Sequence, residues 1–197
     1  MNKFLYFIIF FTIIISIFFI PVVSSTNSEM LKSFKDFEES QIIFLGNTNY
    51  AWPIPGYTRL SSPFGKRKAP TTGASTFHKG IDIPAPEGTK LIATCDGNIT
   101  FTGFLGGGGY TITLTSLDGV KISYCHVSPN YIVNVGDTIT QGQVIGHVGP
   151  KYVYNVSGNI YSDPSNGKPT NGATTGCHLH LGFRINNNYV NPLDYLQ

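Results

Sequence analysis

Charged side chains are scarce in this sequence. Only 12% of its 197 residues are Asp, Glu, Lys or Arg, and the formal net charge at pH 7 is +2. A protein that follows the backbone of DNA or RNA needs a clustered basic face, because phosphate contacts are made largely by Lys and Arg. The sequence has no extended basic run, so we expect no nucleic-acid partner.

Cysteine is also rare, and its number is odd: Cys95, Cys125 and Cys177. The three cannot all pair within one chain, and their spacing does not match the CxxC signature of a metal site. A chain of this length can bury a hydrophobic core without disulfide bonds. We therefore interpret the three thiols as small buried side chains.

Two catalytic motifs are missing. The run Gly106–Gly109 is not followed by Lys-Ser or Lys-Thr, which excludes a phosphate-binding P-loop and predicts the tip of a hairpin. There is also no HExxH motif, which would supply a glutamate as general base. A hydrolase without this glutamate needs another base, and histidine is suited to the role because it titrates near neutral pH.

One long hydrophobic run is present, at the N-terminus. Residues 4–20 are apolar apart from two hydroxyl residues, a lysine precedes them, and the segment PVVSS follows. This order of a charged start, an apolar centre and small residues predicts a secretory signal peptide over residues 1–25. The alternative is an uncleaved membrane anchor, because the run is near the minimum length that spans a bilayer.

Residues 26–57 are expected to form a lead-in to the main domain. Apolar residues recur through 28–44 in a pattern that favours one short helix, with Ser28 as its N-cap. The segment Ala51–Pro63 is rich in proline and glycine and predicts extended chain.

From residue 58 onward the pattern changes to short strands separated by glycine, asparagine and aspartate. The predicted strands are Thr89–Cys95, Asn98–Thr102, Tyr110–Thr115, Val120–His126, Thr138–Ile139, Gln143–Val148 and His178–Ile185. Seven closely spaced strands without a helical run between them predict an all-β sandwich or barrel.

Four of the five histidines lie in three short motifs: His78 with Asp82, His126 at a strand end, and His178 with His180. His and Asp are the ligand types of a catalytic zinc site, which has three protein ligands and one open position. An extended chain would separate residues 78 and 82 by about 13 Å, too far to bind one ion. The chain must therefore bend between them, and Gly80 permits a bend.

Strand alternation predicts where the neighbouring side chains point. His178 and His180 share one face, so one can bind a metal while the other faces a substrate. Alternation also places His126 on the opposite face from Cys125, and places Cys177 on the face opposite His178. On this basis neither thiol should belong to the site.

The order HxxxD, a later His, then HxH resembles the motifs of the lysostaphin/LytM-type zinc metallopeptidases, endopeptidases that cut peptidoglycan cross-links. The resemblance runs from Leu60 to Leu196 and includes the segments FHKGIDIPAPEGTKLIAT, YCHVS and TTGCHLHLGF. It implies a small antiparallel β-sandwich with a metal-bearing groove over residues 58–197.

The resemblance also implies roles for five residues. His78, Asp82 and His180 would bind one zinc ion per domain, and His126 and His178 would be the catalytic acid and base. The implied protein is a secreted monomer at the extracellular side of the cell envelope. It would hydrolyse peptide cross-links of peptidoglycan by metal-activated water, and would contact the membrane only if the leader were retained.

Two other functions stay open. A catalytically inactive envelope scaffold of the same family would be expected to lack a ligand, and none is missing here. A secreted metal-binding protein without catalysis would not need the two extra histidines, because three ligands suffice for the metal.

The sequence departs from the family at two points. Cys177 stands where the family usually has proline before HxH, and the link Pro150–Thr175 is much longer than the family's short turn. Loops of this length are usually functional, so we expect it to form one wall of the groove, with Tyr152, Tyr154 and Tyr161 offered to substrate. The alternative is a surface excursion without a role.

Overall fold

This computed structural model describes Lys32, Lys35 and residues 49–197. The predicted signal peptide lies outside the described residues. So does the predicted helix over 28–44, apart from Lys32 and Lys35, which are both helical. In the part of the chain that is described, no helix is long and apolar enough to cross a membrane. Residues 49–197 form one compact unit.

Within residues 49–197 the regular elements are short strands and two single turns of 3₁₀ helix. The strands are β1 (Gly65–Lys66), β2 (Phe77–His78), β3 (Ile81–Pro84), β4 (Lys90–Ile92), β5 (Gly97–Phe104), β6 (Tyr110–Ser116), β7 (Lys121–Cys125), β8 (Thr138–Ile139), β9 (Val144–His147), β10 (His178–Ile185) and β11 (Asn188–Val190). The 3₁₀ turns are η1 (Gly106–Gly108) and η2 (Pro192–Asp194).

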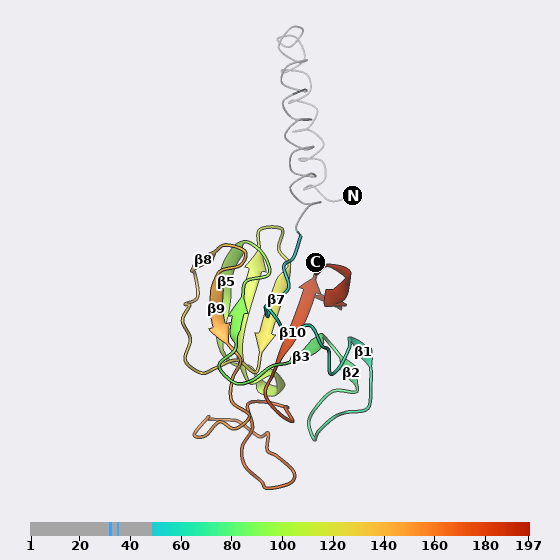
Figure 1. The fold of residues 1–197 in the computed structure, drawn as a ribbon, viewed down its shortest axis with the longest axis vertical. Coiled ribbons are helices and arrows are strands. Elements are labelled where there is room, and N and C mark those ends of the chain that lie inside the picture. Colours follow the sequence, from blue (N-terminus) through green and yellow to red (C-terminus); the bar gives the residue numbers. More distant parts are fainter. Residues whose placement is uncertain (1–31, 33–34, 36–48) are drawn as a thin grey trace, which may run out of the picture. The chain divides into compact units, whose positions relative to one another are not determined.

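The main sheet has the strand order β11-β10-β7-β6-β5-β8, and every pairing in it is antiparallel. Strand β10 pairs with β7 along one edge, and with β3 and then β11 along the other. Two further antiparallel ribbons, β1–β2 and β4–β9, complete the architecture (Figure 1). The all-β antiparallel prediction is confirmed.

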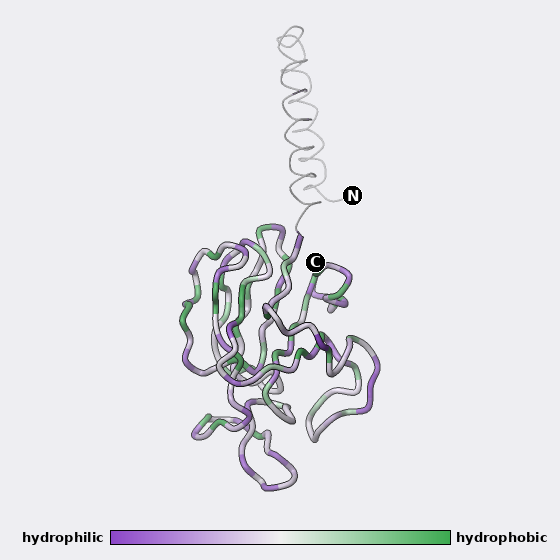
Figure 2. Tube along the Cα trace, in the orientation of Figure 1, coloured by the Kyte–Doolittle hydropathy of each residue, from purple (hydrophilic) through white to green (hydrophobic). Residues whose placement is uncertain are grey.

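The hydrophobic core lies on one face of the main sheet, under the β4–β9 ribbon. The hydroxyl group of Tyr124 in β7 accepts a hydrogen bond from the Thr94 backbone N–H at 2.9 Å. A Cβ atom on Gly146 in β9 would lie 2.8 Å from Ile112 in β6, so ribbon and sheet are in direct contact. Apolar residues follow the strands that enclose this core (Figure 2). The second layer of the sandwich is therefore a two-stranded ribbon.

All seven predicted strands occur within a few residues of their expected bounds, and the Gly106–Gly109 run joins β5 to β6 as a hairpin. Sequence reasoning missed β1, β2, β3 and β11. Strands β1 and β2 have only two residues each, and β3 ends in proline, so none shows a period-two pattern. The partner of β3 is β10, far along the sequence, whereas β11 has only three residues and forms a hairpin with β10.

Candidate metal centre

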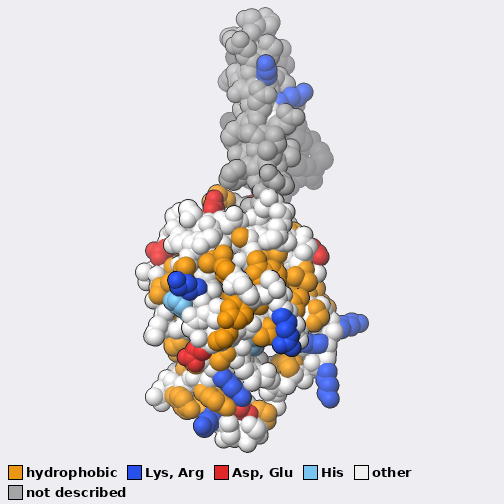
Figure 3. Space-filling model, in the orientation of Figure 1, with side chains coloured by type: hydrophobic (Ala, Val, Ile, Leu, Met, Phe, Trp, Pro, Cys, Tyr) orange, Lys and Arg blue, Asp and Glu red, His pale blue; other side chains and the backbone are white. Residues whose placement is uncertain are grey.

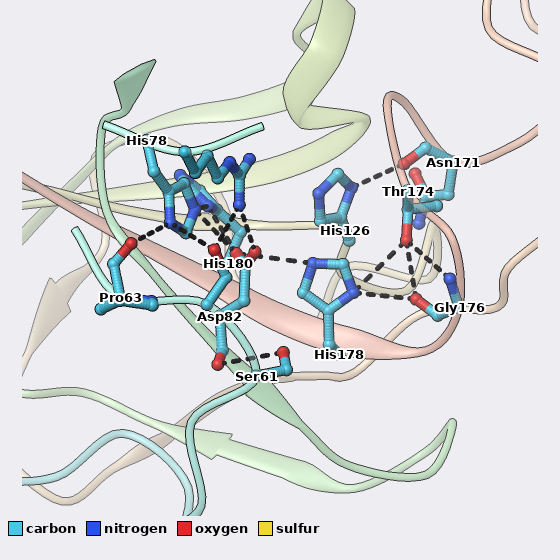
Figure 4. Close-up of polar contacts among 12 residues, drawn as sticks. Ser61, Pro63, His78, Asp82, His126, Asn171, Thr174, Gly176, His178 and His180 are labelled. Carbon is cyan, nitrogen blue, oxygen red and sulfur yellow. Dashed lines mark hydrogen bonds and ion pairs between the residues drawn. The ribbon is translucent and has the colours of Figure 1, made fainter. Parts of the chain in front are cut away.

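Three side-chain donor atoms meet where β2, β3 and β10 come together. Nε2 of His78 lies 2.9 Å from Nδ1 of His180 and 3.0 Å from Oδ1 of Asp82. Nδ1 of His180 lies 2.8 Å from the same carboxylate oxygen (Figure 4). His78 and Asp82 are buried, and His180 is half-buried. The three residues thus form one cluster able to hold a metal ion.

The sheet register explains this convergence. Asp82 and His180 are directly paired between β3 and β10, so their side chains project from the same face. Leu179 and Leu181 project from the other face and are fully buried in the core. The chain bends at Lys79 and Gly80 between β2 and β3, which brings His78 to the same point. The predicted bend and the predicted face of HLH are both confirmed.

Hydrogen bonds fix the tautomer of His78. Its Nδ1 lies 2.7 Å from the carbonyl oxygen of Pro63 and 3.1 Å from the hydroxyl group of Ser62. A carbonyl oxygen can only accept, so Nδ1 carries the proton and Nε2 presents a lone pair to the cluster. Metal-binding histidines are commonly oriented in this way by an acceptor at the other ring nitrogen.

Asp82 is held ionised. Its Oδ2 accepts a hydrogen bond from the Arg67 guanidinium group at 3.0 Å, which leaves Oδ1 facing the histidines. Burial acts to raise the pKa of Asp82, but its contacts with His178, His180 and His78 outweigh burial and hold this pKa well below its ordinary value. Arg67 also donates to the Ser62 hydroxyl at 2.6 Å. Sequence reasoning missed Arg67 and Ser62, which lie in no motif.

The chemistry of the cluster fits a bound cation. Burial lowers the pKa of His180, so its imidazole is neutral at neutral pH. Nε2 of His78 and Oδ1 of Asp82 are acceptors, and Nδ1 of His180 is a third when its ring proton is on Nε2. In that tautomer a cation at the centre satisfies all three atoms. Two nitrogens and one oxygen form a ligand set that Zn²⁺ accepts.

His178 and His126 stand beside this cluster. Nε2 of His178 lies 3.6 Å from Oδ1 of Asp82, and its Nδ1 donates to the carbonyl oxygen of Gly176 at 2.8 Å. The ring of His126 lies 4.7 Å from that of His178, between centroids, and its Nδ1 donates to the carbonyl oxygen of Asn171 at 2.7 Å. With the ring proton on Nδ1, each imidazole presents an Nε2 lone pair that can accept a proton.

All five residues singled out from the sequence line one groove. Its walls are the β1–β2 hairpin, the η1 turn, residues 173–177 of the long loop, and Tyr189 in β11. The structure thus brings three separate sequence motifs to one place.

Comparison with known proteins identifies the family. The sequence profile of peptidase family M23 matches residues 76–192. This chain belongs to peptidase family M23. The match covers the donor cluster, both neighbouring histidines and the long loop.

Relatives and solved structures agree with this assignment. The chain is 37% identical over 137 residues to the DD-carboxypeptidase/endopeptidase Mpg of Neisseria meningitidis, a match that covers 70% of this chain but only 27% of the relative's length. It is 28% identical to the catalytic domain of lysostaphin from Staphylococcus simulans, with a TM-score of 0.55 over 71% of this chain and 91% of that one. A zinc-containing peptidase from Vibrio cholerae gives 25% identity and a TM-score of 0.56, over 73% and 39% of the two chains.

Gly80 lets the turn between β2 and β3 lie close against β10 in the M23 centre. A Cβ atom there would lie 2.3 Å from the carbonyl oxygen of Leu181 and 2.9 Å from the His180 ring. We predict that Gly80→Ala lowers the free energy of unfolding by about 1–3 kcal/mol and weakens metal binding, because β3 or the ring must move. Denaturant unfolding and calorimetric titration with Zn²⁺ measure the two effects. Gly176→Ala is the steric control, since nothing lies within 4 Å of its Cβ position; equal behaviour of the two variants would contradict the prediction.

The prediction for His126 and Cys125 from strand alternation was wrong. Strand β7 ends at Cys125, and His126 has a φ angle of 59°, in the left-handed region. The turn directs His126 toward the groove, away from the core that holds Tyr124. Cys125 is paired with His180 across the sheet, so its side chain faces the same side and also lines the groove.

Although Cys125 lines the groove of this M23 domain, its thiol stays protonated and is therefore not a nucleophile. Burial raises the pKa of Cys125 to about 11 and that of Cys95 to about 12, so about one Cys125 thiol in 10⁴ is ionised at pH 7. Cys177 is less buried and also lines the groove, so the expectation that neither thiol belongs to the site was wrong for both. We predict that iodoacetamide alkylates Cys177 at least about tenfold faster than the other two in the folded protein. Peptide mass spectrometry gives the order, and faster labelling of Cys125 would show that its thiol is activated.

The long loop of this M23 domain meets the groove only through its C-terminal part. Residues 173–177 line the groove, whereas the three tyrosines proposed to face substrate are not among the lining residues. Tyr152 instead bonds Asp163 at 2.8 Å, and Tyr161 packs over Gly73 and Gly107. Tyr152 and Tyr161 therefore pack within the loop and against neighbouring turns, and Tyr154 is exposed outside the groove lining, so that part of the prediction was wrong.

Proposed function

We propose that this chain is a secreted zinc metalloendopeptidase that hydrolyses peptide cross-links of bacterial peptidoglycan. His78, Asp82 and His180 are the proposed zinc ligands, and His126 and His178 are the proposed acid and base. One observation carries the proposal: three possible metal-donor atoms in mutual contact stand beside two histidines whose Nδ1 atoms are held by carbonyl oxygens. The predicted signal peptide agrees with a substrate outside the cell membrane.

The residues of the chain divide the chemical work. Zn²⁺ bound at the cluster would supply a Lewis acid and lower the pKa of a water molecule toward 7. His178 and His126 would then share proton transfer, one taking a proton at Nε2 and the other donating one. Burial holds the pKa of His126 well below its ordinary value, so this ring is neutral and can accept at neutral pH. Carbonyl oxygens of the loop hold both rings in orientation.

The charge of the groove supports a substrate that carries carboxylates. Among the described residues that line it, Arg67, Lys68 and Lys79 are cationic and Asp82 alone is acidic. Lys and Arg side chains are also frequent on the surface beside the β1–β2 hairpin (Figure 3). A directly cross-linked stem peptide bears free carboxylates, whereas a glycine bridge bears no charge. The groove therefore favours the stem peptide, since complementary charge speeds encounter and fixes orientation.

Hydrolysis of defined substrates tests this function. Residues 26–197 are incubated with a directly cross-linked muropeptide dimer and, separately, with a pentaglycine peptide. The products are separated by chromatography. We expect cleavage of the dimer, loss of cleavage with a chelator, and its return on addition of Zn²⁺. Faster cleavage of pentaglycine would reverse the substrate assignment. Stoichiometric zinc binding without cleavage of either substrate or of whole peptidoglycan would favour the inactive scaffold.

A further inference from the structure

Asn171 in the long loop contacts one of the two proposed catalytic histidines, and it is fully buried. Its backbone carbonyl oxygen accepts the hydrogen bond from Nδ1 of His126 at 2.7 Å (Figure 4). The two residues are 45 positions apart in the sequence. No motif in the sequence links them.

The side chain of Asn171 is fixed at both ends of its amide. Its Oδ1 accepts from the backbone N–H of Tyr110, the first residue of β6, at 2.8 Å. Its Nδ2 donates to the carbonyl oxygen of Val127, the residue after His126, at 3.0 Å. The backbone N–H of Asn171 donates to Lys151 at 2.9 Å. The amide thus joins the loop to the chain segment that carries the histidine.

Two glycines allow this close approach. A Cβ atom on Gly109 would lie 2.3 Å from both oxygens of Asn171, and one on Gly172 would lie 2.3 Å from the Gly109 nitrogen. Contacts this tight leave Asn171 little freedom to shift. Its carbonyl oxygen is therefore held in one place as an acceptor.

We propose that Asn171 is the positioning residue of His126, with the side-chain amide clamping the loop so that the backbone carbonyl sets the imidazole tautomer. Because the carbonyl can only accept, the ring proton stays on Nδ1 and the Nε2 lone pair stays available toward the groove. His126 needs such a partner because its left-handed backbone lies outside the strand ladder that orients His178. The inference rests on the proposed catalytic role of His126.

The test compares Asn171→Ala with Asn166→Ala in the zinc-loaded protein. Asn166 is the matched control because its side chain also makes two hydrogen bonds inside the loop, to Tyr152 at 3.0 Å and Lys168 at 2.9 Å, but none to a histidine. We expect Asn171→Ala to lower kcat on the muropeptide dimer by about 10–100-fold, with KM within about threefold and zinc retained. Asn166→Ala should keep wild-type kcat.

Imidazole ¹⁵N NMR reports the tautomer of His126, which a loss of stability alone would not change. With the His126 signals assigned by His126→Gln, wild type should show a proton on Nδ1, and Asn171→Ala should show a mixture of tautomers or a proton on Nε2. Should Asn171→Ala fail to fold, Asn171→Asp serves instead, since it keeps the acceptor for Tyr110 and loses only the donor to Val127. A folded variant with unchanged His126 tautomer and unchanged kcat would overturn the inference. Wild-type activity of His126→Gln would instead refute the catalytic role of His126.

Discussion

His178→Ala and His126→Ala will each bind about one zinc ion per chain and lose about 10²–10⁴-fold in kcat, the usual contribution of a general acid or base. Neither side chain supplies one of the three donor atoms in mutual contact, although Nε2 of His178 lies only 3.6 Å from Asp82. Metal analysis by mass spectrometry and kinetics on the muropeptide dimer measure the two properties separately. His147→Ala is the control, because this remaining histidine lies in the β9 ribbon.

The assignment within HLH depends on which variant loses metal. If His178→Ala lost zinc while His180→Ala kept it, the roles of the two histidines would be reversed. If both kept zinc, His180 would not be a ligand, and the contact between its Nδ1 and Asp82 would be only a hydrogen bond.

Asp82→Ala and His180→Ala will lose zinc and turnover together. Removing the carboxylate takes away the only anionic donor of the cluster and leaves Arg67, at 3.0 Å in the wild type, without its partner. Zinc content should fall from about one ion per chain to near zero, and cleavage of the dimer should become undetectable. Zinc should also cease to stabilise the variant: at 100 times Kd, a bound ligand adds about 2.7 kcal/mol to the wild type.

Thermal unfolding with and without Zn²⁺ shows this difference directly. Asp82→Asn is the closest variant in shape, and it keeps an oxygen donor without the charge. We expect it to bind zinc more weakly than wild type and more strongly than Asp82→Ala. Full activity of Asp82→Ala would exclude the carboxylate from the metal site.

The parts of the site that sequence reasoning reached are those governed by strand periodicity. Two residues separated by one leucine must share a face, so HLH in β10 could be interpreted without a structure. The bend at Gly80 followed from the distance between two ligands that serve one ion. HxH alone occurs in many strands without a metal, and the metal was predicted from the combination of the histidine motifs. The choice of His78, Asp82 and His180 as its ligands needed the family resemblance.

Sequence reasoning missed the parts of the site that depend on local departures from strand periodicity or on contacts between residues far apart in the sequence. Alternation fails at His126 because one left-handed residue ends the strand there, and nothing in YCHVS signals that change. Arg67 contacts Asp82 across 15 residues and Asn171 contacts His126 across 45 residues, and such pairs leave no repeated pattern in the sequence. The tyrosines of the long loop were assigned to substrate because their chemistry suits it, but Tyr152 and Tyr161 pack within the fold and Tyr154 is exposed away from the groove lining.

The double pairing of β10 has a consequence for how the site responds to thermal motion. This strand carries two of the five site residues, borders Asp82 on one side, and pairs on the other with β7, the strand that leads to His126. Amide hydrogens in the centre of a sheet exchange with solvent only in the rarest openings, whereas those in loops exchange readily. The proposed catalytic geometry is therefore attached largely to the slowest-exchanging part of the domain, and β2 adds His78 from the β1–β2 hairpin. Mutations confined to the largely exposed loop 68–76 between β1 and β2 can accumulate without replacing any residue of the donor cluster, although several residues of this loop line the groove.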